Sequence, residues 1–259
     1  MSGPARSRDS GPGVAWVTGA GKGIGRALAK RLAQDGWTVV ASARTLADLE
    51  SLAADCPPGA LHPLQLDVTD AAVVEAAVAT IEAEVGPIAL AVLNAGTHVP
   101  LTAESFSVES VRHLVETNLM GTVNALAPLM PRFIRRRGGR IAVVASLAGY
   151  RGLPTASAYG ATKAGLINLC EALKPELERR GVALKLINPG FVETPLTARN
   201  DFPMPFLIPV EAAVEQIVRG LESSAFETAF PWRFAVLMKL LRLLPDRLFF
   251  ALTRRMVRD

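Results

Sequence analysis

The chain has 259 residues, of which 50% are hydrophobic and 20% are charged, a composition typical of a globular protein. This length suits one α/β domain with a large core. Cys56 and Cys170 are too few for a disulfide framework and fit a reducing compartment, so we expect a cytoplasmic protein. His62, His98 and His113 share no ligand spacing, which argues against a metal site.

The net charge of +4 is placed unevenly along the chain. Residues 229–259 contain seven Lys/Arg and two Asp/Glu, a net charge of +5, which leaves −1 for residues 1–228. A second basic cluster comprises Arg132, Arg135, Arg136, Arg137 and Arg140. These arginines lack an interleaved aromatic platform for stacking bases, so a solvated helix end explains them better than a nucleic-acid site. We therefore expect no nucleic-acid partner.

The first 13 residues are small, polar and rich in Pro and Gly, which predicts a flexible N-terminal arm over 1–13. Beyond them, short apolar runs alternate with amphipathic stretches. The runs predict strands at 14–18, 38–43, 61–66, 88–93, 140–146 and 183–188, with a weaker one at 227–231. Helical periodicity fills the gaps, for instance over 70–86, where Thr69 is a plausible N-cap.

The order of these elements indicates the fold class. Strands separated by helix-length connections predict right-handed crossovers and a parallel sheet covered on both faces. The expected fold is therefore α/β: a single doubly wound Rossmann domain over 14–231, with a mostly parallel sheet of about seven strands. Residues 232–259 are expected to add a basic amphipathic helical tail.

The first predicted strand runs into the glycine-rich stretch "TGAGKGIG", from Thr18 to Gly25, and a helix follows near Ile24. A helix N-terminus offers free N–H groups and a positive dipole end to a pyrophosphate. The usable glycines are Gly19, Gly23 and Gly25, a departure from the common G-x-G-x-x-G spacing. A tight turn alone would explain one of them but hardly three, so we predict a dinucleotide-binding loop.

The charges near this loop indicate which dinucleotide binds. An NAD site usually places Asp or Glu about 20 residues after the loop, on the ribose 2′-hydroxyl. Here that segment reads "ASARTL", with Arg44 and no carboxylate, and Lys22 adds a cation inside the loop. Both could neutralise a 2′-phosphate, so NADP(H) is favoured and NAD(H) is the alternative.

A phenol and an ammonium lie four positions apart in "SAYGATKAG", residues 157–165, and so share one face of a helix. Taken alone, the pair could be idle surface. A phenol near pKa 10 is a poor proton shuttle at neutral pH until a cation stabilises its phenolate, and Lys163 supplies one to Tyr159. Tyr159 is then the general acid in reduction and the base in oxidation. Ser146, ending the fifth strand, would hold a carbonyl oxygen, and Tyr150 is expected only to line a pocket.

With these residues in place, the chain resembles the short-chain dehydrogenase/reductase family over residues 14 to about 195. The resemblance rests on the T-G-x-x-x-G-x-G loop, Asp67 in "LDV", N-A-G at 94–96, Asn118, Ser146, Y-x-x-x-K at 159–163 and "NPGFVET" at 188–194. It implies an NADP-dependent carbonyl reductase or alcohol dehydrogenase, in which Asn118 serves a water-linked proton relay and Lys163 also holds the nicotinamide ribose.

The resemblance also assigns cofactor contacts. Asp67 would bond the adenine ring, although a helix-entry cap is its simpler explanation, and the segment after Pro189 would meet the nicotinamide. The residues expected to bind the cofactor are Thr18, Gly19, Lys22, Gly23, Ile24, Gly25, Arg44, Asp67, Val68, Asn94, Ala95, Gly96, Tyr159, Lys163, Pro189, Gly190, Val192 and Thr194. Those expected to act in catalysis are Asn118, Ser146, Tyr159 and Lys163.

The substrate is expected to be a small ketone or secondary alcohol of apolar character. Residues 195–209 are proline-rich and irregular, which indicates a mobile lid whose inner face would carry Phe202, Met204, Phe206 and Leu207. By resemblance we expect a homo-oligomer, a dimer or tetramer, formed through two long helices at about 104–131 and 156–180. His98 follows the N-A-G motif and either lines the site or is a plain loop histidine.

Two rival functions use the same fold. A non-catalytic nucleotide sensor would have little reason to retain Ser146, Tyr159 and Lys163 together. An epimerase or dehydratase relative would hold NAD tightly, which the glycine spacing and Arg44 argue against.

The tail, residues 232–259, contains no run of 18 uncharged apolar residues and is divided by Pro245 into two helical pieces. In the second piece, Arg247, Arg254 and Arg258 fall on one side at 100° per residue. Leu248, Phe249, Leu252 and Met256 fall on another. This pattern fits a helix lying on an anionic membrane surface. It fits equally a tail packed on its own domain or on a partner subunit.

Overall fold

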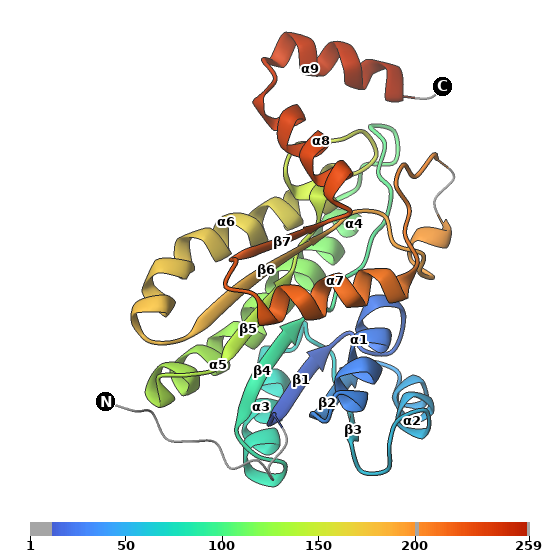
Figure 1. Cartoon of the computed structure of the whole chain (residues 1–259). Helices are drawn as coiled ribbons and strands as arrows, with labels where there is room; N and C mark the ends of the chain where they lie inside the picture. Colours follow the sequence, from blue (N-terminus) through green and yellow to red (C-terminus); the bar gives the residue numbers. More distant parts are fainter. Residues whose placement is uncertain (1–11, 200–201, 258–259) are drawn as a thin grey trace.

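Seven parallel strands form one sheet in the computed structural model, which describes residues 12–199 and 202–257 (Figure 1). In chain order they are β1 (Val14–Thr18), β2 (Thr38–Ala43), β3 (Leu61–Gln65), β4 (Ile88–Leu93), β5 (Arg140–Val144), β6 (Ala183–Pro189) and β7 (Glu227–Phe230). Their order in space is β3-β2-β1-β4-β5-β6-β7, and every neighbouring pair is parallel. The predicted fold class is confirmed.

The burial of the strands explains why their sequence pattern was readable. All five residues of β1 are buried, as expected for a strand covered on both faces. The edge strand β3 differs, because three of its five residues are exposed and one of them is Pro63. Proline cannot donate a hydrogen bond to the ladder and is tolerated at a sheet edge. The hydrophobic run is therefore weakest where the sheet ends.

Helices occupy the connections between the strands. They are α1 (Gly23–Gln34), α2 (Leu46–Ala54), α3 (Ala71–Glu84), α4 (Val108–Leu114), α5 (Gly121–Arg136), α6 (Ser157–Arg179), α7 (Val210–Glu222), α8 (Trp232–Leu243) and α9 (Asp246–Thr253). A π-helical turn, Val115–Met120, joins α4 to α5 without a break. The helix expected over about 104–131 therefore begins later and contains this turn, while α6 matches the helix expected at 156–180.

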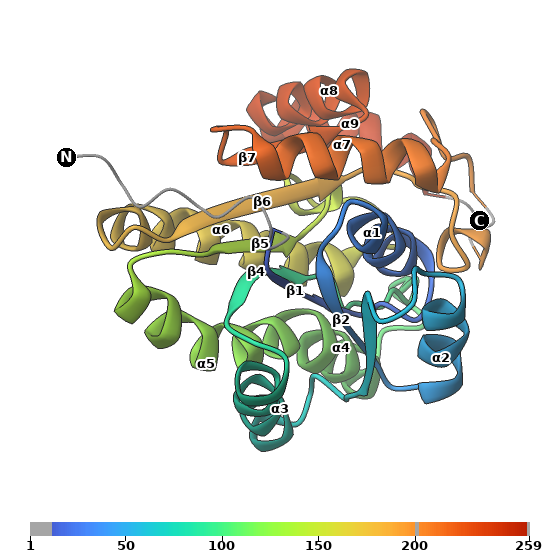
Figure 2. The ribbon, with the colours of Figure 1, turned by 60° about the horizontal axis from the view of Figure 1, so that its bottom comes forward.

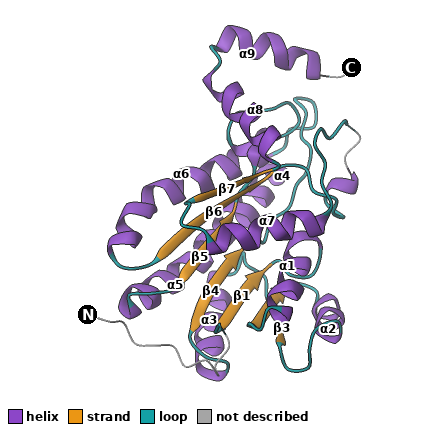
Figure 3. Ribbon diagram, in the orientation of Figure 1, coloured by secondary structure: helices purple, strands orange, loops and turns teal. Residues whose placement is uncertain are grey.

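The helices form a layer on each face of the sheet. Side chains of α3, α5 and α6 share one hydrophobic cluster with the sheet, and those of α1, α2 and α7 share another. Figure 2 shows α3, α4 and α5 together on one side and α7 on the other, and Figure 3 shows the strands between them. Helix α8 adds Phe234, Ala235 and Met238 to the first cluster. Its inner face is thus continuous with the core of the domain.

The N-cap predicted for α3 is wrong by one residue. Asp70, not Thr69, caps the helix, since its carboxylate accepts a hydrogen bond of 3.0 Å from Val73 N. Thr69 instead donates to Asp67 Oδ1 through its amide at 2.9 Å and its hydroxyl at 2.8 Å. Both residue types can cap a helix, so the choice depends on the turn that precedes it.

The tail forms two helices separated at Pro245, as predicted. The apolar face predicted for the second is divided in α9, because Phe249 is buried whereas Leu248 and Leu252 are exposed. No helix among the described residues is long and apolar enough to cross a membrane. Residues 1–11 of the predicted arm, 200–201 of the predicted lid and Arg258 lie outside the described residues.

Candidate active site

The predicted site residues follow the carboxyl ends of four adjacent strands. Thr18 ends β1, Asn94 follows β4, Ser146 lies two residues beyond β5, and Pro189 ends β6. Strands β1 and β4 are neighbours in the sheet although two strands separate them in the chain, so the strand order reverses between them. Ligands of doubly wound sheets bind in the crevice at this point.

The glycine loop between β1 and α1 is shaped for close approach. Gly19 has φ of +65°, and a Cβ at Gly25 would lie only 2.3 Å from the carbonyl oxygen of Gly19. No side chain at Gly25 fits that space. The cap residue Lys22 makes no side-chain hydrogen bond to α1, and the first turn carries no acidic residue. The free N–H groups of this turn therefore fit the pyrophosphate of a dinucleotide.

Thr18 and Asn94 brace this loop against the N-A-G segment. The hydroxyl of Thr18 accepts hydrogen bonds from Asn94 N at 3.0 Å and Ala95 N at 3.1 Å. In return, the Asn94 amide donates to the carbonyl oxygens of Thr18 and Gly19 at 3.1 and 3.2 Å. Both side chains are engaged within the protein, so they position the backbone around the crevice.

The charges near the end of β2 are mixed. Arg44 is exposed and forms no ion pair with any residue in the described part of the chain. Lys22 Nζ, in contrast, lies 3.5 Å from the Asp48 carboxylate on α2. Sequence reasoning missed Asp48, because only the orientation of α2 brings it to the loop. Of the two predicted cations, Arg44 is the one without an ion pair in the described part of the chain.

Asp67 lies near Arg44 at the same end of the site. Burial alone would raise the pKa of the Asp67 carboxyl, but hydrogen bonds from Thr69 and the nearby charges of Arg44 and His113 hold it below its usual range. Asp67 does not cap α3, whose cap is Asp70. Val68, next in the chain, is buried, and its carbonyl oxygen accepts a 2.9 Å hydrogen bond from Asn124. Asn124 thus holds the backbone of this segment, and the Asp67 side chain is exposed.

Lys163 is the buried cation of the site. Its side chain is 4% exposed, its Nζ donates to Val144 O at 2.9 Å, and the same atom lies 5.8 Å from the centre of the Tyr159 ring. Burial lowers the pKa of Lys163 from 10.5 to about 8. The ammonium form therefore still dominates at neutral pH.

Tyr159 and Ser146 meet across the crevice. Burial raises the pKa of Tyr159, and its hydrogen bond with Ser146 offsets part of that rise. We expected Lys163 to lower this pKa, but burial raises it, and Ser146 is the group that lowers it. Ser146 Oγ accepts from Ala148 N at 3.1 Å and can donate to Pro189 O at 3.3 Å. Tyr159 is thus held in its protonated form.

Asn118 is fully buried in the π-helical turn between α4 and α5. Its Oδ1 accepts from Thr97 N at 2.7 Å, while its Nδ2 donates to Thr97 O at 2.9 Å and to Thr162 Oγ1 at 3.2 Å. A Cβ at Gly96 would lie 3.3 Å from Asn118 Oδ1 and 3.5 Å from Lys163 Nζ. The side-chain amide is therefore fully engaged with Thr97, which directly follows the N-A-G motif, and with Thr162 on α6.

His98 is a site residue that the sequence left undecided. Its ring packs edge-on against Tyr159, with ring centroids 4.7 Å apart. Burial lowers its pKa, and its Nδ1 has no hydrogen-bond partner among the described residues. His98 therefore presents an unpaired nitrogen of a neutral ring beside the phenol. Its position just after the N-A-G motif was the only signal in the sequence.

The "NPGFVET" segment closes the other side of the crevice. Gly190 N donates to Phe230 O at 2.7 Å, and Val192 pairs with Ile208 in an isolated bridge that ties the lid segment down. A Cβ at Gly23 would lie 3.2 Å from the Thr194 methyl group, so this segment reaches the glycine loop. In the lid, Phe202 contacts Phe191 with ring centroids 5.9 Å apart.

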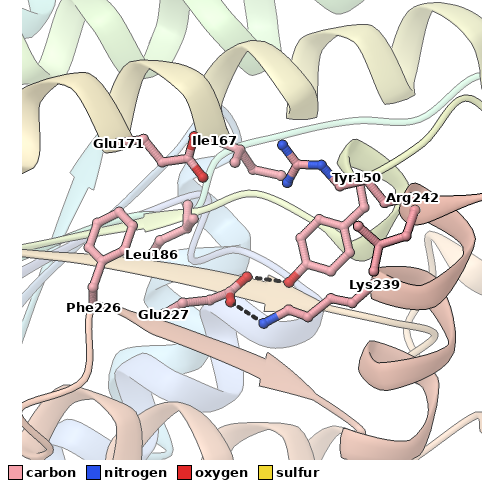
Figure 4. Close-up of a pocket in the computed structure, with 9 residues that line it drawn as sticks. Tyr150, Ile167, Glu171, Leu186, Phe226, Glu227, Lys239 and Arg242 are labelled. Carbon is pink, nitrogen blue, oxygen red and sulfur yellow. Dashed lines mark hydrogen bonds and ion pairs between the residues drawn. The ribbon is translucent and has the colours of Figure 1, made fainter.

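Tyr150 lies apart from the crevice. Its hydroxyl donates to Glu227, and burial together with this bond raises its pKa far above its usual value. It lines a cavity of about 530 Å³ that Glu227, Lys239 and Arg242 also line. Figure 4 shows the Glu227 carboxylate between Tyr150 and Lys239, whose Nζ donates at 2.6 Å. Tyr150 is a wall residue, as expected, and this cavity includes neither Tyr159 nor Lys163.

Comparison with known proteins identifies the family. A family model described as short chain dehydrogenase matches residues 13–202. The chain belongs to this family. A Myxococcus xanthus protein named "Uncharacterized oxidoreductase" is 39% identical to this short-chain dehydrogenase over 245 residues, 94% of this chain and 97% of that one. Estradiol 17-beta-dehydrogenase 1 of Rattus norvegicus is 38% identical over 189 residues, 70% of this chain and 54% of that one.

A solved structure with a bound cofactor resembles this chain. A short-chain dehydrogenase from Sphingobium yanoikuyae in complex with NADPH matches this chain with a TM-score of 0.78 at 25% identity. The match covers 90% of this chain and 96% of that one. Membership makes this short-chain dehydrogenase an oxidoreductase acting on CH–OH groups, in a family that binds NAD(P) and small-molecule substrates.

Proposed function

We propose that the protein is an NADP(H)-dependent carbonyl reductase that also oxidises the matching secondary alcohol. The observation that carries this proposal is the contact of Tyr159 with Ser146, with Lys163 Nζ 5.8 Å from the Tyr159 ring. A proton donor, an oxygen-binding hydroxyl and a cation at one point are what carbonyl reduction requires. A nucleotide sensor or an epimerase would not need all three.

Each residue has a role in the proposed reaction. Bound NADPH supplies the hydride. Ser146 donates a hydrogen bond to the carbonyl oxygen and holds it beside Tyr159, which passes its proton to that oxygen. Lys163, charged at neutral pH, stabilises the resulting phenolate and orients the nicotinamide ribose. Because burial raises the pKa of Tyr159, the phenol is protonated at neutral pH and has a proton to donate in reduction.

Asn118 is proposed to position the others and to serve the proton relay. Its buried side chain holds the N-A-G loop, and its place in a π-helical turn is a feature often found at functional sites. The proposed cofactor contacts are the glycine loop from Thr18 to Gly25, Asp67 with Val68, the N-A-G segment, and Pro189 to Thr194. Arg44 would pair with the 2′-phosphate.

The preference for NADP(H) rests mainly on Arg44. It is exposed and unpaired within the described chain, whereas the charge of Lys22 is partly compensated by Asp48. The NADPH-bound relative supports the same cofactor. NAD(H) would meet Arg44, and not a carboxylate, directly after β2, where an NAD site usually holds the 2′-hydroxyl; Asp48, further along on α2, lies beside Lys22.

We further propose an apolar carbonyl substrate, self-association and a cytoplasmic site of action. The lid carries Phe202, Phe206 and Leu207, and a relative is named for a steroid. The basic apolar tail after Pro231 would bring the enzyme to an anionic membrane surface.

The test is a panel of ketones followed by NADPH absorbance, extended from small soluble ketones to long-chain and steroid-like ones. The proposal expects turnover of at least one apolar ketone and faster turnover with NADPH than with NADH. A nucleotide sensor would bind NADPH without turnover, and an epimerase would retain NAD through purification. Either outcome would overturn the proposal.

A further inference from the structure

The two tail helices carry most of the exposed apolar surface of the protein. Sixteen large hydrophobic residues are exposed in the described chain, and ten of them lie in the 26 residues from 232 to 257. We call these ten the tail surface: Trp232, Val236, Leu237, Leu240, Leu243, Leu248, Phe250, Leu252, Met256 and Val257. Such a concentration marks an interaction site rather than ordinary scattered exposure.

The tail surface is held in place by contacts on the opposite side of the helices. On α8, Phe234, Ala235 and Met238 are buried in the main core. On α9, Phe249 is 3% exposed and the Arg151 guanidinium lies 4.4 Å from its ring centre. Arg151 also pairs with Asp246 at 2.6 Å. The exposed apolar side chains therefore project from anchored helices, and Figure 1 shows α9 beyond the rest of the molecule.

The charge of the same segment identifies the kind of partner. Residues 232–257 contain six Lys/Arg and one Asp, a net charge of +5, and all six cations are exposed. Arg233 lies 5.4 Å from the ring centre of Trp232, whose side chain is 68% exposed. Aromatic and basic residues next to an apolar face match the interface between lipid headgroups and acyl chains.

A second copy of the chain is the main rival occupant. In a two-fold contact the same patch would meet itself, which places +5 against +5. The remaining residues, 1–231, sum to −1 because residues 258–259 add none, so they offer little opposite charge to a head-to-tail contact. An anionic bilayer supplies negative charge for the basic side chains and an apolar interior for the exposed hydrophobic ones. It can also receive a projecting surface without needing a groove of matching shape.

The tail is also joined to the substrate lid. Phe234, on the inner face of α8, stacks on Phe191 with ring centroids 5.6 Å apart and on Phe206 with centroids 5.9 Å apart. Phe191 lies in the segment proposed to meet the nicotinamide, and Phe206 belongs to the lid and is 44% exposed. One aromatic stack thus connects the docking helices to the entrance of the site.

We infer that α8 and α9 dock the enzyme on anionic membranes. The Phe191–Phe234–Phe206 stack, which joins α8 to the lid, then places the entrance of the site next to the bilayer. The substrate would then be a lipid-soluble ketone that enters from the membrane beneath the lid. This substrate class rests on the proposed reductase function, whereas the docking itself does not.

Docking is tested by co-sedimentation of the full-length protein with vesicles of phosphatidylcholine, alone or mixed with phosphatidylglycerol. Binding is expected only to the mixed vesicles and should weaken at high salt. The variant Leu240→Gln/Leu248→Gln/Phe250→Gln should lose at least about 10-fold in vesicle affinity, since three exposed apolar contacts are removed. The control Val73→Gln/Phe106→Gln/Val108→Gln changes three exposed apolar residues elsewhere and should bind like the wild type.

Three outcomes would overturn the docking inference. They are no binding of the wild type to the mixed vesicles at low salt, unchanged binding of the tail variant, or a tail variant that instead loses self-association. The last would assign the tail surface to contacts between copies. Circular dichroism and NADPH binding establish that the variant is folded.

The link to the site is tested by kinetics. Anionic vesicles should lower the KM of the wild type for a long-chain ketone several-fold and leave a small soluble ketone unaffected. The tail variant should keep its activity on the small ketone, and vesicles should no longer lower its KM for the long-chain ketone. If the wild type binds vesicles but its KM for the long-chain ketone is unchanged, the proposed link between the tail and the lid is wrong. If it binds vesicles but reduces no ketone, the proposed function fails while docking stands.

Discussion

Replacing Lys163 by methionine is expected to stabilise the free protein at neutral pH while abolishing its turnover. The ammonium is buried, and burial lowers its pKa from 10.5 to about 8. The unfolded chain therefore binds this proton more tightly than the folded chain, so charging Lys163 opposes folding. Methionine has an unbranched stem and no charge, and it removes this opposition.

The magnitude follows from the pKa and from one lost contact. A shift from 10.5 to about 8 corresponds to about 3 kcal/mol of the free energy of unfolding. The variant also loses the 2.9 Å hydrogen bond from Nζ to Val144 O, and a buried carbonyl without its partner costs about 1–3 kcal/mol. The variant should therefore be more stable by about 1 kcal/mol at about pH 7.

The advantage of the variant should reverse at high pH. Below about pH 8, Lys163 is protonated in both the folded and the unfolded wild type, and burying its charge lowers the free energy of unfolding by the full amount. Between about 8 and 10.5 the folded protein releases the proton while the unfolded chain retains it, so this loss of stability fades. At about pH 10 the variant should be the less stable protein by about 1 kcal/mol, because the lost hydrogen bond then dominates.

Urea unfolding of both free proteins at the two pH values measures this difference. Lys30→Met is the matched control, because Lys30 is a surface lysine whose ammonium lies 3.8 Å from Asp55. Its stability relative to wild type should barely change between the two pH values. If Lys163→Met is destabilised equally at both, Lys163 is not a desolvated cation and the account of its charge is refuted.

Three further predictions address the cofactor loop, its specificity and assembly. Gly25→Ala should abolish NADPH binding and destabilise the fold by about 1–3 kcal/mol, because the new Cβ would lie 2.3 Å from Gly19 O. Gly152→Ala is the control, because a Cβ there meets nothing within 4 Å. It should change neither the NADPH affinity measured by titration nor the free energy of unfolding measured in urea. Arg44→Asp should weaken NADPH binding by about 10- to 100-fold and shift kcat/KM toward NADH, and an unchanged preference would refute the assignment to the 2′-phosphate. Sedimentation of the full-length protein at micromolar concentration should show a dimer or tetramer, and a monomer would contradict the proposed self-association.

Local sequence patterns were sufficient for the parallel sheet and for the positions of its strands along the chain. Strands such as β1 are buried along their whole length, so each leaves an unbroken apolar run. The glycine loop was readable for a similar reason, because the backbone at Gly25 excludes every side chain. Tyr159 and Lys163 were predictable together since one helical turn fixes their separation.

Contacts between distant segments were beyond such patterns. Asp48 reaches Lys22 only through the orientation of α2, and His98 reaches Tyr159 only through the course of an irregular loop. The raised pKa of Tyr159 depends on the burial of the whole crevice and not on its neighbour in sequence. The stack of Phe234 on Phe206 joins residues 28 positions apart through the packing of α8 on the core.

The central claim is that Tyr159 delivers the proton to the carbonyl oxygen, and the comparison of two tyrosine variants tests it most directly. Tyr159 and Tyr150 are the only tyrosines in the chain, and the hydroxyl of Tyr150 is committed to Glu227. With NADPH and a ketone that the wild type reduces, Tyr159→Phe should bind NADPH normally and lose about 10²–10⁴-fold in kcat. Tyr150→Phe should keep most of its kcat. A Tyr159→Phe enzyme with a kcat near that of the wild type would contradict the account.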